Sequence, residues 1–163
     1  MGNSAGATIA YYAGLRAAAE VEDLEPLQIR GLILRQAFFG GIQRTGSELR
    51  LANDPVIPLC VIDLLWELAL PIGADRDHEY ANPTAGNGSK TLDKMGALGW
   101  RVMVSGCKGD PLVDREIAEA KLMTERGVQV VCDIEEEGHH EIEYAQPSKA
   151  KELTGVIKDF ISQ

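Results

Sequence analysis

A serine, an aspartate and a histidine in this sequence have the residue types that a nucleophilic hydrolase requires. Ser4 lies in Gly2-Asn3-Ser4-Ala5-Gly6, a G-x-S-x-G pattern whose physical basis is a sharp strand-to-helix turn that exposes a strained serine. A serine that simply caps the following helix would explain the same five residues. Asp110 and the pair His139-His140 follow later, each just beyond an expected strand.

The chain order of these residues decides between the two explanations. Serine, acid and histidine follow one another as in an α/β hydrolase. Catalytic groups in open α/β sheets gather at the carboxyl ends of the strands, so Asp110 and the histidine pair are expected in the layer of Ser4. Alone, Asp110 could be a helix cap before Pro111, and a loop histidine could be solvated. The three together favour a nucleophilic site.

The elements that must position these residues alternate along the chain. Alanine content, Pro and Gly stop signals and apolar periodicity predict helices over 5–20, 56–70, 112–126 and 148–162. Apolar runs predict strands over 29–39, 100–106 and 128–134. Between Gly73 and Lys90 the chain is dense in Asp, Asn, Gly and Pro, and we expect a long loop there. Such alternation is typical of a parallel α/β sheet with flanking helices.

Composition and charge exclude several classes of function. The 163 residues contain 16 Lys and Arg against 25 Asp and Glu, a net charge of −9, which disfavours nucleic-acid and anionic-membrane partners. The most apolar stretch, 56–70, is shorter than the ~20 residues of a membrane span. Three separated cysteines fit a reducing compartment, so we expect a cytoplasmic protein. Cys107, Cys132 and His139-His140 lack the spacing of metal ligands, so no metal is expected.

Longer motifs carry a resemblance to a known family. The segment Gly2–Tyr11 resembles the nucleophile elbow of the plant carboxylesterases, in the hormone-sensitive-lipase-like branch of the α/β hydrolases. Similar to that family as well are Phe38-Phe39-Gly40-Gly41, Leu65–His78, Gly109–Asp114 and Gly138-His139-His140. The resemblance spans essentially the whole chain.

The resemblance implies a carboxylic ester hydrolase acting on small esters without a cofactor. It assigns Ser4 as nucleophile, His140 as general base and then acid, and Asp110 as the residue that orients His140. The backbone N–H of Ala5 is the implied oxyanion donor. Asp114 is expected to be structural, and His139 is the competing base, expected to be an exposed neighbour.

The chain also departs from the family. Only three residues precede Ser4, so no strand is expected to lead into the turn, and a His-Gly-Gly-Gly-type oxyanion loop is absent from this sequence. We therefore expect residues 1–163 to be the carboxyl-terminal part of a hydrolase domain, with about three parallel strands and a cap-remnant helix at 55–72. The strand at 31–39 would then be unpaired and prone to self-association.

This departure leaves several functions open. We expect the chain as given to be a weakly active esterase. The alternatives are a ligand-binding module like the gibberellin receptors, a non-hydrolytic dehydratase or transesterase of the same family, and an inactive fragment.

Overall fold

The computed structural model describes residues 1–85 and 89–163. The first half of the chain forms β1 (Gly2–Asn3), α1 (Ala5–Ala19), the 3-10 helix η1 (Val21–Leu24), β2 (Gly31–Arg35), α2 (Gly46–Arg50) and α3 (Leu59–Ala69). The second half forms α4 (Ser89–Ala97), β3 (Arg101–Cys107), α5 (Val113–Glu125), β4 (Gln129–Glu135), α6 (Ile142–Ala145) and α7 (Pro147–Ser162).

The strands form one parallel sheet in chain order, β1-β2-β3-β4. The register aligns Leu34 of β2 with Val104 of β3 and Cys132 of β4. Because all strands run the same way, their carboxyl ends meet at one edge of the molecule. The residues that follow each strand therefore come together there.

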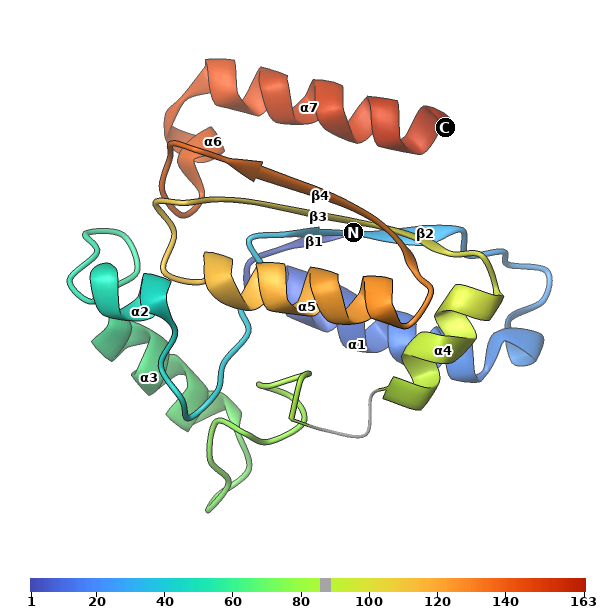
Figure 1. Ribbon diagram of the computed structural model, residues 1–163, viewed down its shortest axis with the longest axis horizontal. Coiled ribbons are helices and arrows are strands. Elements are labelled where there is room, and N and C mark those ends of the chain that lie inside the picture. Colours follow the sequence, from blue (N-terminus) through green and yellow to red (C-terminus); the bar gives the residue numbers. More distant parts are fainter. Residues whose placement is uncertain (86–88) are drawn as a thin grey trace.

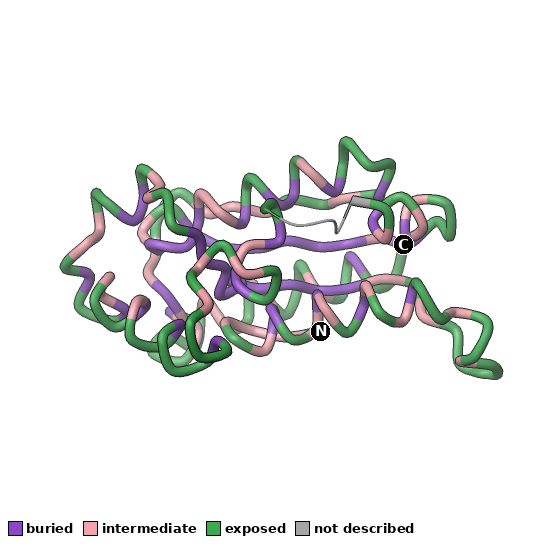
Figure 2. The backbone as a smooth tube through the Cα atoms, turned by 90° about the horizontal axis from the view of Figure 1, so that it is seen from below, coloured by how far each residue is buried: buried purple, intermediate pink, exposed green. Residues whose placement is uncertain are grey.

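Helices cover both faces of this sheet (Figure 1). On one face α1, α4 and α5 enclose the main core, in which Tyr11, Val104 and Met123 are almost fully buried. On the other face α7 places Phe160 against Ile33 of β2 and its neighbour from β3. Buried backbone runs through the strands at the centre of the molecule (Figure 2). The alternation of side chains along each strand supplies both apolar layers.

Helix α3 lies with α2 at the carboxyl ends of the strands (Figure 1). It begins after Pro58, has Pro71 just beyond its end, and buries only Ile62 and Trp66. These two residues pack with Phe38 and others in a second cluster, whereas Leu68 of the same helix is 74% exposed. Helix α3 therefore lies outside the main core of the sheet, and its assignment to a cap stays a prediction.

Three expectations about the elements were wrong. A short strand, β1, does precede Ser4 and pairs with β2 at Leu34 and Arg35, so the sheet has four strands and β2 is not wholly unpaired. Strand β2 ends at Arg35 because Gln36 adopts a φ of +43°, which stops the extended backbone. Helix α4 starts within the expected loop, whose residues 86–88 lie outside the described part of the chain.

Candidate active site

The backbone around Ser4 has the geometry of a strand-to-helix elbow. Ser4 stands between β1 and α1 with φ +52° and ψ −124°, a conformation that costs energy for any residue with a Cβ atom. Its N–H donates to the Arg35 carbonyl at 2.9 Å, and its own carbonyl accepts from the Phe38 N–H at 3.2 Å. These bonds to the end of β2 stabilise the strained turn.

Close backbone packing requires one of the two glycines in the pattern. A Cβ atom on Gly2 would lie 2.0 Å from the carbonyl oxygen of Gly6, so only glycine fits at position 2. No atom lies within 4 Å of the corresponding position on Gly6. Close backbone approach at this turn therefore depends on Gly2 and not on Gly6.

The structure brings Ser4, Asp110 and His140 together. His140 Nε2 lies 2.9 Å from Ser4 Oγ, and His140 Nδ1 lies 2.7 Å from Asp110 Oδ2. Because a carboxylate can only accept, Nδ1 carries the proton toward Asp110 and Nε2 is left to accept from the serine hydroxyl. A serine, a base and an orienting acid in this arrangement can activate the serine oxygen.

The electrostatics of the site favour the imidazolium form of His140. Burial alone would lower the pKa of His140, which is 4% exposed. The hydrogen bond and charge of Asp110, with the charges of Glu141 and Glu143, outweigh burial and raise the pKa of His140 above its ordinary value. The protonated form of the His140 ring is therefore stabilised by the carboxylate beside it.

The neighbouring candidates lie elsewhere. Asp114 Oδ2 accepts from the Ser47 N–H at 2.7 Å, which ties α5 to α2. His139 is half-buried and not exposed as expected; its Nδ1 lies 2.9 Å from the carbonyl oxygen of His140, and it makes no hydrogen bond to Ser4 in the described structure. Ala5 is the first residue of α1, where helix N–H groups have no intrahelical acceptor, and it lines the cavity beside Ser4.

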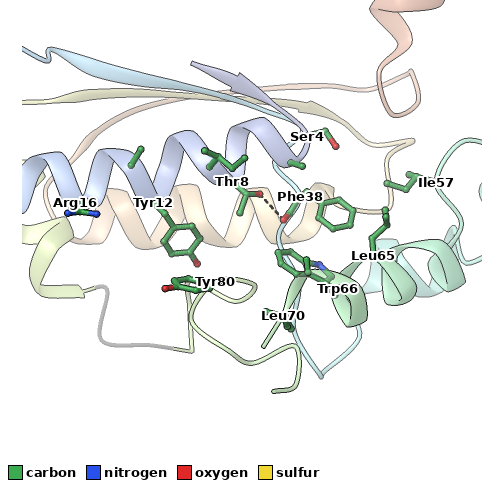
Figure 3. Close-up of a pocket in the computed structure, with 14 residues that line it drawn as sticks. Ser4, Thr8, Tyr12, Arg16, Phe38, Ile57, Leu65, Trp66, Leu70 and Tyr80 are labelled. Carbon is green, nitrogen blue, oxygen red and sulfur yellow. Dashed lines mark hydrogen bonds between the residues drawn. The ribbon is translucent and has the colours of Figure 1, made fainter. Parts of the chain in front are cut away.

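A cavity of about 840 Å³ opens next to Ser4 (Figure 3). Its walls come from α1, from the segment after β2, from α3 and from Tyr80. Phe38 and Trp66 stack with ring centroids 5.1 Å apart on one side, and Tyr12 and Tyr80 meet edge to face at 6.0 Å on the other. The sequence motifs indicated the nucleophile but not this aromatic lining, which only the tertiary fold assembles.

Within the described residues, no group of three or more His, Cys, Asp and Glu side chains could hold a metal ion. None of the helices there has the length and apolar character needed to cross a bilayer.

Fold and sequence define the class to which the chain belongs. The chain is a member of the alpha/beta hydrolase fold family, whose sequence profile matches residues 1–143. Its fold resembles that of a fungal esterase from Rhizomucor miehei, with a TM-score of 0.79 at 15% identity over 99% of this chain and 50% of that one.

Two plant enzymes are among its relatives. The chain is 53% identical to Carboxylesterase 20 of Arabidopsis thaliana over 161 residues, which are 99% of this chain and 49% of the relative. It is 48% identical to 3-O-acetylpapaveroxine carboxylesterase CXE2 of Papaver somniferum over the same length, covering 51% of that protein. The resemblance to plant carboxylesterases is confirmed, and the chain spans about half the length of the curated relatives it matches.

Proposed function

We propose that this chain supplies the Ser-His-Asp residues of a carboxylic ester hydrolase. The observation that carries the proposal is the pair of hydrogen bonds on opposite ring nitrogens of His140, one to Ser4 and one to Asp110. A ligand-binding module has no need for a histidine that accepts the proton of Ser4. The geometry therefore favours hydrolysis over a receptor-like role.

The proposed reaction has two steps. His140 Nε2 removes the proton of Ser4 as Oγ attacks the ester carbonyl carbon, and the imidazolium then protonates the departing alcohol. Water, activated by the same nitrogen, attacks the acyl-serine and releases the acid and free Ser4. Asp110 keeps the proton of Nδ1 in place throughout. The N–H of Ala5, the first residue of α1, donates to the oxyanion in this proposal.

The cavity beside Ser4 suggests the substrate class. Its lining is mostly apolar and aromatic, and Arg16 is the charged side chain among the described lining residues. Such a surface binds an ester with an apolar acyl or alcohol group, because burying that group releases water from both surfaces. We propose small esters with an apolar or aromatic substituent.

We also propose that residues 1–163 form the carboxyl-terminal part of a hydrolase domain, with 55–72 in its cap. The half-length match to the relatives supports this division. On this proposal, further oxyanion donors come from the other part of the domain. Loss of a single such donor costs ~10²–10³ in turnover, so this chain alone is expected to be a weak esterase.

The open part of β2 supports an association proposal. Within the described chain β1 pairs with only Leu34 and Arg35, which leaves Gly31–Ile33 without a neighbour on that side. Free strand edges pair readily with other chains. We propose that isolated copies associate through this edge. When the chain is joined to the remaining part of a relative's domain, we expect a monomer in size-exclusion chromatography.

The activity is tested by hydrolysis of a p-nitrophenyl acyl ester. We expect slow turnover by the chain as given, an increase of several orders of magnitude when the remaining part of a relative's domain is fused or co-expressed, and loss of turnover in Ser4→Ala in both contexts. Ordinary esterase rates that persist in Ser4→Ala would contradict the proposal. An inactive fused protein would favour the receptor, dehydratase or fragment alternatives.

A further inference from the structure

One buried side chain holds the segment that carries His140, here called the His140 loop and defined as residues 138–143, the last two of which begin α6. The amide oxygen of Gln36 accepts from the Glu141 N–H at 2.8 Å, and its Nε2 donates to the His139 carbonyl at 3.2 Å. These two peptide groups flank His140 on either side in the chain. A single amide thus fixes the backbone immediately before and after the imidazole.

The backbone of Gln36 is strained in the same region. Among the described non-glycine residues, positive φ values occur at Ser4 (+52°), Gln36 (+43°) and Glu141 (+58°). Each costs of order 1–3 kcal/mol and persists only where the surroundings fix it. Ser4 bonds to His140, and Gln36 bonds to Glu141, so all three strained residues lie within one hydrogen-bonded group.

The hydrogen-bonding pattern requires glutamine in particular. The side chain must accept from one peptide group and donate to another at the same time, which a carboxylate cannot do. Gln36 is fully buried, so water cannot replace either bond. An apolar residue of the same volume would leave the His139 carbonyl and the Glu141 N–H without these partners.

Neighbouring residues secure the far side of the same loop. Asn3 Nδ2 donates to Glu141 Oε1 at 2.9 Å, and Arg35 donates twice to Glu143 at 2.8 and 2.7 Å. Asn3 and Arg35 end β1 and β2, next to Ser4 and Gln36 respectively. The ends of two strands therefore set the position of the His140 loop relative to Ser4.

We propose that Gln36 is a positioning residue for His140. By fixing the peptide groups on both sides, it keeps Nε2 at hydrogen-bonding distance from Ser4 Oγ and Nδ1 at that distance from Asp110. This role concerns the position of the His140 ring. Only its kinetic consequence rests on the proposed ester hydrolysis.

The kinetic test uses Gln36→Met, which keeps the volume and removes both hydrogen bonds. The control is Gln129→Met on β4, where the glutamine is exposed. Misplacing a reacting group by about 1 Å can cost ~10²-fold, so we expect kcat on a p-nitrophenyl ester to fall by about that factor with little change in KM. In Gln36→Asn, the asparagine tolerates a positive φ, so this variant folds more readily. Its side chain is too short to reach both the His139 carbonyl and the Glu141 N–H, and we expect kcat to fall here as well.

A second readout does not depend on turnover. In an NMR titration we expect the pKa of His140 to fall toward its ordinary value in Gln36→Met and Gln36→Asn, and the Nδ1 proton signal to be lost as its bond to Asp110 loosens. If both variants match Gln129→Met in the titration, and in kcat where the parent is active, the inference is wrong. If the parent shows no turnover, the proposed hydrolysis fails while the titration still decides the role of Gln36.

Discussion

Two buried carboxyl groups near the start of α5 have opposite surroundings. Asp110 and Glu116 are both fully buried. Asp110 receives the Leu112 N–H on Oδ1 at 2.9 Å and the His140 Nδ1–H on Oδ2 at 2.7 Å. Neither carboxyl oxygen of Glu116 has a hydrogen-bond partner in the described structure. Only Asp110 therefore has the donors that a buried carboxylate needs.

The different surroundings favour different protonation states for these two acids. Burial raises the pKa of Glu116 well above its ordinary value, the charge of Asp110 raises it further, and Arg35 opposes both. The neutral, protonated form of Glu116 is thus favoured beside the charge of Asp110. Gly106 leaves room for it, since a Cβ there would lie 2.1 Å from Glu116 Oε2. Both carboxyl groups are buried, and they differ in their hydrogen-bond partners.

The largest expected effect separates the two acids by activity. Asp110→Asn removes the carboxylate that holds the His140 tautomer, and losses of ~10⁴ in kcat accompany such a change in a Ser-His-Asp site. Glu116→Gln replaces one neutral group by another, so we expect kcat on a p-nitrophenyl ester to stay near the parent value. The measurement is steady-state kinetics of both variants in the fused protein. Equal losses of kcat in the two variants would contradict the proposed difference between Asp110 and Glu116.

A second expected effect concerns the ion pair that joins the end of β2 to the His140 loop. The side chains of Arg35 and Glu143 are only 7% and 10% exposed and bond at 2.7 Å. Removing one partner of a buried pair leaves an unpaired charge, so we expect Arg35→Met to lower the free energy of unfolding by about 3–5 kcal/mol. Replacing both residues with methionine should restore most of that loss. Urea denaturation measures both, and a double variant as unstable as the single one contradicts the account.

A smaller effect is expected from Glu119, the other buried acid of α5. Burial raises the pKa of Glu119 to about 7, and the hydrogen bond from Tyr11 opposes this rise. The unfolded chain releases this proton above its ordinary pKa of 4.5 while the folded chain keeps it, so stability falls as pH rises from about 4.5 to about 7. At ~1.4 kcal/mol per pH unit, the loss reaches up to about 3 kcal/mol.

Glu119→Gln keeps an oxygen for the Tyr11 hydroxyl and removes the titration. We therefore expect its free energy of unfolding to decline less than that of the parent between pH 5 and 8, as measured by urea denaturation across this range. Parallel pH profiles for parent and variant would show that Glu119 is ionised in both states.

Much of this arrangement was predictable from local sequence patterns. The helices expected at 5–20, 112–126 and 148–162 match α1, α5 and α7. Alanine content indicates the first, Gly127 marks the end of the second, and apolar residues on one face indicate the third. Ser4, Asp110 and His140 were identified as candidates because a motif and a chain order mark them. The fold class follows from the same alternation of elements.

Features that depend on tertiary register were not predictable. Strand β1 has two residues, too few for a periodic signal, and exists only because β2 pairs with it. Among the described side chains of helix α4, Leu92 and Met95 are fully buried, but the helix is short and follows a segment rich in Gly and Asn, so no helix was predicted there. Gln36 looks in the sequence like an ordinary polar residue after an apolar strand. Its hydrogen bonds reach a loop more than 100 positions away, so its proposed positioning role has no local signal.

On the proposed function, Ser4 is a nucleophile activated by His140 and Asp110. Reaction of the chain with a phosphonofluoridate ester, followed by peptide mass spectrometry, tests it directly, because such a reagent bonds covalently to an activated serine. We expect one adduct, on Ser4, that forms far more slowly in His140→Ala and is absent in Ser4→Ala. An adduct on another residue, or labelling of Ser4 at the same rate in His140→Ala, would contradict the account.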